Sequence, residues 1–148
     1  MLFAIGGHPA FNLKDGQNYF MFDYTEDIMY RQIDASGLYD PVSEYILKND
    51  GYAAITKGMF DNDALIIEEK PIHEVSLCGN DKKPYVTVKF DAPLFGLWSP
   101  GDSPFVCIEP WYGRCDRSGF SGELADKDYI YKLDANKEFK AEYEIEFI

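Results

Sequence analysis

The sequence predicts an all-β domain, built as an antiparallel sandwich or barrel. Short apolar stretches of strand length recur along the chain, and clusters of Gly, Pro, Asn and Asp separate them. No long stretch keeps the spacing of apolar residues that is typical of an amphipathic helix. Aromatic residues, which favour strands, make up 16% of the 148 residues. A chain of this length fits a single domain, residues 1–148, with its own hydrophobic core.

The expected strands follow one another in short steps along the chain. They cover residues 2–5, 19–22, 28–33, 64–68, 74–77, 85–90, 105–109 and 139–147. Stretch 85–90 is rich in β-branched and aromatic residues, and stretch 139–147 alternates apolar with charged residues. Expected turns lie at residues 14–16, 49–51, 79–81 and 99–102. Residues 57–62 are expected to form at most one short turn of helix.

The apolar stretch 2–5 begins directly after Met1. Natural domains usually open with a few solvated residues before the first buried strand. We therefore expect this start to lie inside a longer protein, as a cut or a late start codon.

The chain is strongly acidic, with 14 Lys and Arg against 26 Asp and Glu and a net charge of −12. Such a surface repels phosphate backbones and anionic lipids, so we expect neither nucleic acid nor a membrane as a partner. The start resembles no signal peptide, and no segment has the length of a transmembrane helix. The three cysteines, Cys78, Cys107 and Cys115, are irregularly spaced, and no N-glycosylation acceptor occurs. A reduced, cytoplasmic protein is the simplest interpretation.

The first candidate functional residue is His8, which follows the opening apolar stretch within the segment Gly-Gly-His-Pro-Ala-Phe-Asn. Two glycines allow a close approach to a ligand or a positive φ, and Pro9 stiffens the chain after the histidine. A histidine held at a strand end suits proton transfer. On residue types alone, a structural histidine in a turn is the more frequent case.

The second candidate is Glu109, which closes the apolar stretch 105–109 and precedes Pro110, Trp111 and Tyr112. A carboxyl at this position is costly unless it is paired, hydrogen-bonded or facing a cavity. Partial burial would raise its pKa from the ordinary value toward neutrality, which suits a general base. The neighbouring aromatic rings would offer flat surfaces to a sugar. A solvent-facing glutamate is about as frequent on composition alone.

Other positions carry weaker signals. Asp63 lies in an acidic turn before a buried strand, and Trp98 lies before Ser-Pro; a plain turn and a core tryptophan explain these two without any function. His8, His73 and the cysteines fit no metal-ligand spacing, so we expect no metal. No phosphate-binding loop, nucleophile elbow or nicotinamide fingerprint occurs.

Taken together, these segments resemble the aldose 1-epimerase family, in its bacterial galactose-mutarotase-related branch. Residues 7–12, Gly-His-Pro-Ala-Phe-Asn, look like the HPaFN signature of that branch. Matches to later family segments follow in the same order: Phe-x-Asn-Asp-Ala-Leu at 60–65, Leu-Trp-Ser at 97–99, Val-Cys-Ile-Glu-Pro-Trp-x-Gly at 106–113, and the tail over 123–143. The resemblance therefore spans nearly the whole chain.

The resemblance implies a large antiparallel β-sandwich, the galactose-mutarotase-like supersandwich. It also implies that His8 is the general acid and Glu109 the general base that interconvert the α and β anomers of an aldohexose, phosphorylated or not. Asp63, Asn12 and Trp111 would contact the sugar. No cofactor is implied, because both chemical steps are proton transfers.

The resemblance covers only the C-terminal half of full-length members of the family. Their N-terminal half supplies further strands, together with a second histidine and an arginine that help to hold the sugar. We therefore expect the chain to lack part of the site. We also expect either a missing N-terminal half or a homo-oligomer to cover the exposed sheet.

Three other functions remain open on the sequence. A sugar-binding module without turnover would use Trp98, Trp111 and Tyr112 as platforms. A glycoside hydrolase would pair Glu109 with Asp63 across one sugar. A structural half-domain would need its other half before it bound anything.

Overall fold

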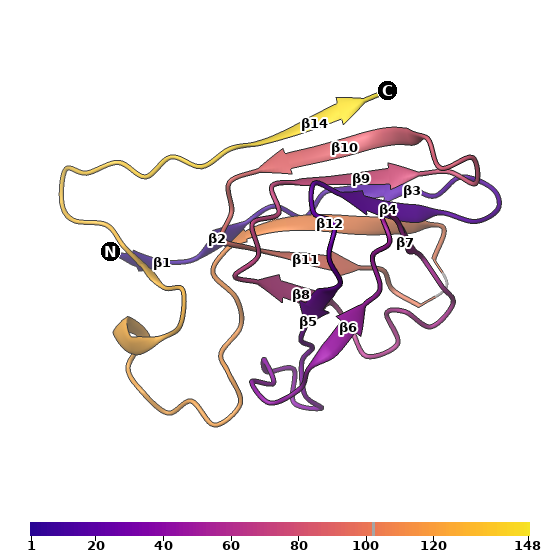
Figure 1. The fold of residues 1–148 in the computed structure, drawn as a ribbon. Coiled ribbons are helices and arrows are strands. Elements are labelled where there is room, and N and C mark those ends of the chain that lie inside the picture. Colours follow the sequence, from indigo (N-terminus) through magenta and orange to yellow (C-terminus); the bar gives the residue numbers. More distant parts are fainter. Residues whose placement is uncertain (102) are drawn as a thin grey trace.

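The computed structural model describes residues 1–101 and 103–148, and its regular elements are short strands and one 3-10 turn (Figure 1). The elements, in chain order, are β1 (Leu2–Phe3), β2 (Ile5–Gly6), β3 (Ala10–Asn12), β4 (Tyr19–Phe22), β5 (Ile28–Tyr30), β6 (Tyr45–Leu47), β7 (Ala53–Ala54), β8 (Leu65–Glu68), β9 (Glu74–Cys78), β10 (Pro84–Phe90), β11 (Leu94–Trp98), β12 (Phe105–Tyr112), the 3-10 turn η1 (Leu124–Asp126), β13 (Tyr131–Lys132) and β14 (Tyr143–Phe147). These strands pair antiparallel, as the sequence predicts.

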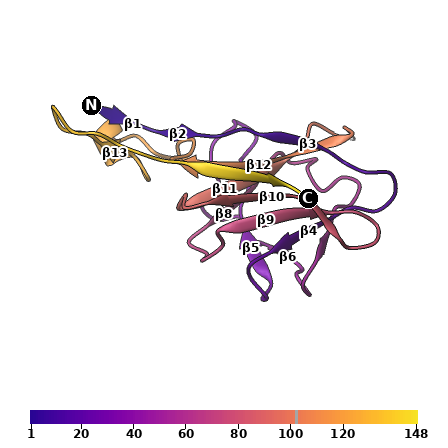
Figure 2. The ribbon, with the colours of Figure 1, turned by 90° about the horizontal axis from the view of Figure 1, so that it is seen from above.

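Two five-stranded sheets form the body of the molecule. One has the order β14-β10-β9-β4-β7, and the other has the order β2-β12-β11-β8 with β3 also paired to β12. Two-stranded pairs, β1-β13 and β5-β6, lie outside these sheets. Figure 2 shows β14 along one edge and the β1-β13 pair at the N-terminal end.

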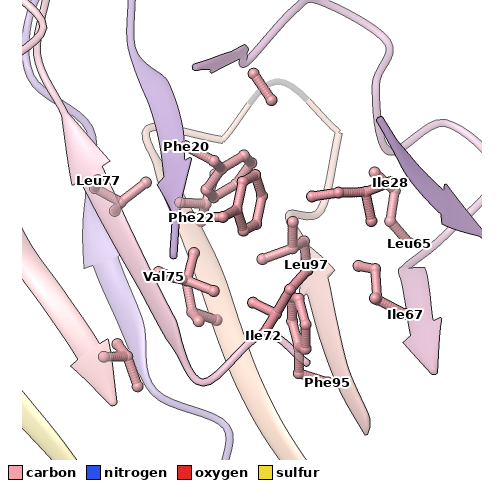
Figure 3. Packing of buried hydrophobic residues seen from close by; sticks show 14 of the residues in the cluster. Phe20, Phe22, Ile28, Leu65, Ile67, Ile72, Val75, Leu77, Phe95 and Leu97 are labelled. Carbon is pink, nitrogen blue, oxygen red and sulfur yellow. The ribbon is translucent and has the colours of Figure 1, made fainter. Parts of the chain in front are cut away.

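The two sheets bury a common core between them. Phe20 of β4 and Leu77 of β9 come from one sheet, and Leu65 of β8 and Leu97 of β11 come from the other, and all four are fully buried. Figure 3 shows these side chains pointing toward one another, with Ile28 beside them. Alternate residues of each strand point to this core, which is the period of two expected for a sandwich.

Strand β12 is the longest and organises the second sheet. Its first half pairs with β3, and its last two residues pair with β2. Residues 7–9 form the break between β2 and β3, and they cross β12 at its middle. This arrangement determines where His8 lies relative to Glu109.

The structure confirms most of the predicted strands and corrects others. Residues 2–5 form two separate strands with different partners, because β1 leaves the sandwich to pair with β13. The strand predicted at 28–33 ends at Tyr30, and the one predicted at 139–147 begins only at Tyr143. Residues 57–62 form turns without a helix. Asp102, the last residue of one predicted turn, lies outside the described residues.

The sequence reasoning missed β11, whose residues read Leu-Phe-Gly-Leu-Trp. Both faces of this central strand are buried, so it lacks the alternation of polar and apolar residues that marks a half-exposed strand. In the described part of the chain, no helix is long or apolar enough to cross a bilayer.

Candidate active site

The candidate site lies on the outer face of the second sheet, where β12 turns alternate residues away from the core. Val106 and Ile108 pack into the core. By the alternation of a strand, Cys107, Glu109 and Trp111 project from the opposite face. A strand that is apolar apart from Glu109 thus places a thiol, a carboxyl and an indole on one surface.

His8 is held over the middle of this surface by the backbone on either side of it. The Gly7 N–H donates to the Pro110 carbonyl at 2.9 Å, and the Ile108 N–H donates to the Pro9 carbonyl at 3.2 Å. These bonds place His8 Nδ1 3.5 Å from Glu109 Oε1. The structure therefore brings the two predicted acid–base residues together, although they are far apart in sequence.

The two partners differ strongly in exposure. The Glu109 side chain is only 7% exposed, whereas the His8 side chain is 61% exposed. Burial raises the pKa of Glu109 and nearby Asp63 adds to the rise, while His8 and the hydrogen bond from Trp111 oppose it. The net effect is a carboxyl that takes up protons more readily than an exposed one, as a general base requires.

Trp111 lies beside the acid–base pair in a slot made by two glycines. Its Nε1–H donates to Glu109 Oε2 at 3.3 Å. A Cβ on Gly6 would lie 2.7 Å from the indole, and one on Gly96 would lie 2.6 Å from it. Gly96 is also the residue directly opposite Glu109 in the β11–β12 ladder. The glycines therefore let the ring lie against the sheet, next to the carboxyl that it orients.

Asp63 borders the same cavity from the turn before β8. It has a φ of 73°, a conformation that Asp tolerates better than most residues. Its Oδ1 accepts a hydrogen bond from the Ala64 N–H at 2.7 Å. Its negative charge reaches Glu109 strongly enough to raise the pKa of that carboxyl.

The cavity above the sheet has a volume of about 480 Å³. It is lined by Gly6, Gly7, His8, Ile33, Gly37, Asp63, Ala64, Ile66, Glu109, Trp111, Gly113, Arg114 and Cys115. This volume suits a small organic ligand.

The sequence reasoning missed Arg114, which lines the cavity and is almost fully buried. Its guanidinium pairs with Glu68 Oε1 at 2.5 Å and with Asp128 Oδ2 at 3.0 Å, and it lies 3.6 Å from the centre of the Tyr39 ring. The Tyr39 hydroxyl donates to Glu68 Oε2 at 2.6 Å, and burial together with this carboxylate raises the pKa of Tyr39 to about 12. An arginine two residues beyond a largely buried strand was the available signal, because buried arginines are nearly always paired.

The other predicted residues lie outside the cavity lining. Asn12 is exposed, and its carbonyl accepts a hydrogen bond from the Tyr85 hydroxyl of the other sheet. The Trp98 ring contacts the His8 ring edge to face, with 5.8 Å between the ring centroids, so it limits the movement of the histidine. Tyr112 contacts Tyr131 and Phe139 on the core side of β12. Of the three proposed aromatic platforms, only Trp111 lines the cavity.

One set of potential metal ligands occurs among residues 1–101 and 103–148. It comprises His8, Cys107 and Glu109, whose ligand atoms all lie within 4.8 Å of one another. Their spacing in sequence resembles no metal motif. His8 comes close to Cys107 and Glu109 because β2 and β3, on either side of it, pair with β12.

Fold and site together define a β-sandwich with a histidine–glutamate pair in a cavity on one sheet. Comparisons with known proteins support the fold. The galactose mutarotase related enzyme from Lactobacillus acidophilus superposes with a TM-score of 0.88 and 32% identity, over 100% of this chain and 52% of that one. A galactose mutarotase-like protein from Lactobacillus casei superposes with a TM-score of 0.69 and 22% identity, over 98% of this chain and 51% of that one. The second likeness supports the fold alone.

Two curated relatives come from Lactococcus lactis subsp. lactis: the chromosomal and plasmid forms of Protein LacX. Each is 28% identical over 155 residues, which cover 98% of this chain and 52% of the relative. No protein-family model matches the sequence. The chain spans about half the length of the relatives it matches. It has the galactose-mutarotase-like fold and resembles galactose mutarotase-related proteins along its whole length.

Proposed function

We propose that the chain carries the acid–base pair of an aldose 1-epimerase-like isomerase, which interconverts the α and β anomers of an aldohexose. The observation that supports this most directly is the contact between buried Glu109 and exposed His8 at 3.5 Å, inside a cavity that Trp111 also lines. The similarity to proteins named as galactose mutarotase related agrees with it.

The proposed reaction needs two proton transfers and no cofactor. Glu109 removes the proton from the anomeric hydroxyl while His8 donates a proton to the ring oxygen, so the C1–O5 bond breaks and C1 becomes an aldehyde. Rotation about the C1–C2 bond presents the other face of the aldehyde. The ring oxygen then attacks C1, His8 recovers its proton, and Glu109 returns its proton to O1.

The contacts of the pair fit these roles. Burial makes Glu109 a stronger base than an exposed carboxylate, and the Trp111 N–H holds one of its oxygens. His8 turns Nδ1 toward Glu109, which leaves the opposite ring nitrogen to serve a ligand. Asp63, at the rim, would accept hydrogen bonds from sugar hydroxyls.

Magnetisation-exchange NMR between the α and β anomers of galactose, glucose and glucose 6-phosphate tests the proposal. Wild-type chain should accelerate the exchange, and Glu109→Gln should lower the rate by about 10²- to 10⁴-fold, the usual contribution of a general base. The rate should fall on acidification with a midpoint above the ordinary pKa of a glutamate, because the carboxyl must be ionised to act.

The surface pair His73–Asp91, 3.7 Å apart, offers a matched control. His73→Gln and Asp91→Asn change the same kinds of group outside the cavity and should leave the exchange unchanged. Wild-type exchange rates in Glu109→Gln would contradict the proposal.

A sugar-binding role without turnover is the second candidate, and the 61% exposure of His8 favours it. The site is open on that side, and the longer relatives have a second half of chain in addition to the matched one. Saturable chemical-shift changes on titration with sugar, without anomer exchange, would assign this role.

We also propose that the protein acts in the cytoplasm. All three cysteines are thiols, and two of them, Cys78 and Cys107, are buried. A reducing compartment keeps such thiols free. Cell fractionation with an antibody against the chain tests this location.

A further inference from the structure

The proposed reaction leaves one chemically capable side chain of the site unused. Cys107 precedes Glu109 by two residues on β12 and projects from the same face, and it is only 1% exposed. Its sulfur lies within 4.8 Å of the ligand atoms of both His8 and Glu109. A nitrogen, a sulfur and an oxygen donor therefore converge beneath the cavity.

This donor set has a definite preference among metal ions. Zinc takes imidazole, thiolate and carboxylate ligands, and its open sites use three protein ligands with a fourth position for water or substrate. Magnesium and calcium prefer oxygen donors, so the thiol disfavours them. With metal–ligand bonds of about 2.0–2.3 Å, neighbouring donors in a tetrahedral site lie roughly 3.3–3.8 Å apart.

The three donor atoms need only a small movement to reach the spacing of a tetrahedral site, and the surroundings of His8 allow it. Cys107 and Glu109 are held by the β12 ladder, whereas His8 is 61% exposed and can turn toward them. Trp111 donates to Glu109 Oε2, which leaves Oε1, the oxygen nearest to His8, for the ion. An outer hydrogen bond of this kind orients a metal-bound carboxylate.

We propose that His8, Cys107 and Glu109 form a binding site for a thiophilic divalent ion of the zinc type, and that this ion competes with the sugar. On binding, the Sγ–metal bond replaces the S–H bond, and the thiol proton leaves to solvent. The ion takes the donor atoms that would otherwise move protons, so it inhibits anomer exchange. The inhibition rests on the proposed function, whereas the binding does not.

Cobalt(II) is the probe for the binding itself, because a cobalt–thiolate bond gives a charge-transfer absorption band in the near ultraviolet. Titration of reduced, metal-free protein should give this band with one ion per chain, and equimolar zinc should displace it. Cys107→Ser should abolish the band and weaken zinc affinity by more than the roughly 10- to 100-fold that loss of an outer hydrogen-bond partner of a ligand costs, because it removes a ligand itself. His8→Gln, a change at an exposed side chain, should weaken zinc affinity without affecting folding.

Cys115→Ser and Cys78→Ser are the matched controls. Cys115 also borders the cavity, and Cys78 is equally buried but lies on the other sheet. Both variants should keep the cobalt band. A band that survives Cys107→Ser, a band lost in Cys115→Ser, or a wild-type titration without a stoichiometric endpoint would overturn the site.

The activity measurement separates the two proposals. Zinc should inhibit anomer exchange in the wild type, a chelator should restore it, and Cys107→Ser should resist inhibition at the same zinc concentration. Equal inhibition of Cys107→Ser would remove the proposed competition. If the metal-free wild type shows no exchange, the proposed function fails, while the cobalt spectra still decide the metal site.

Discussion

At the residue scale, Glu109 is held where its charge is disfavoured. Burial raises its pKa, and His8 and Trp111 only partly oppose that rise. The folded protein therefore binds a proton at Glu109 more tightly than the unfolded chain does. Its stability falls as pH rises through the window from the unfolded pKa to the higher folded pKa, and the cost remains above that window.

Replacing Glu109 with Gln should accordingly stabilise the protein at neutral pH. The amide oxygen can still accept from Trp111, and the variant carries no buried charge. We expect a melting temperature several degrees higher than that of the wild type at pH 7, and a smaller difference near pH 4. Thermal unfolding followed by circular dichroism across this pH range measures it. Asp91→Asn, at a side chain that is 97% exposed, should show no such pH-dependent gain.

Arg114 differs from Glu109, because its buried charge is paired with two carboxylates. Its side chain is 5% exposed and lies between Glu68 and Asp128. Arg114→Met would leave the Glu68 carboxylate buried without its guanidinium, a change that typically costs about 3–5 kcal/mol. Chemical denaturation should show a loss of that size.

Lys89→Met provides the comparison for Arg114. Lys89 pairs with Glu146 at 2.7 Å on the surface, where ion pairs contribute about 0–1 kcal/mol. A loss in Arg114→Met no larger than in Lys89→Met would contradict a structural role for the buried cluster.

At the element scale, the β11–β12 pair builds the floor of the site. Opposite residues Gly96 and Glu109 share the outer face, and the Trp111 ring covers the position where a side chain at 96 would lie. The absence of a side chain on β11 is therefore as important for the site as the carboxyl on β12.

Gly96→Ala should displace Trp111, because the added Cβ would lie 2.6 Å from its ring. We expect a destabilisation of about 1–3 kcal/mol, as is usual for overpacking. A change in tryptophan fluorescence should accompany it. Gly79→Ala is the control, since its added Cβ would meet neighbours only at 3.4 Å or more. Unchanged fluorescence in Gly96→Ala would contradict the slot described for Trp111.

At the scale of the whole molecule, the sandwich has one open side. Tyr143, Ile145 and Phe147 of β14 pair with core residues of β10, so they lie on the core-facing side of their sheet. Phe147 is nevertheless 77% exposed, so the core does not cover its ring. Figure 1 shows β14 at the outer edge of its sheet, paired on one side to β10.

An edge strand with exposed apolar residues favours pairing with another strand. We expect the isolated chain to self-associate through β14, and more strongly at high salt, because each copy carries a net charge of −12. Sedimentation velocity over a concentration series measures the association. Phe147→Lys should weaken it, whereas Val42→Lys, at another exposed apolar side chain, should not. A monomer at all concentrations and salt levels would refute this expectation.

The amino-acid sequence predicts the fold class and most of the longer strands, and it singles out the two residues at the centre of the candidate site. β-Branched and aromatic residues bounded by turn residues are local signals, so they predict strands such as β4 and β10 directly. His8 and Glu109 each stand out within a segment, and the resemblance of those segments to the aldose 1-epimerase family gave the two residues their expected roles. Strand β11 contains Gly96 and no β-branched residue and is buried on both faces, so neither composition nor alternation marks it as a strand.

Which distant side chains meet depends on how the strands pair and pack. The pairing of β12 with β2 and β3 brings His8 onto Glu109 and Cys107, and the same sheet places Arg114 on Glu68. It also places Tyr112 on the core side of β12 and Asn12 outside the cavity. Strand register is a non-local property that depends on the packing of both sheets, and a shift by one residue would move Glu109 from the cavity into the core.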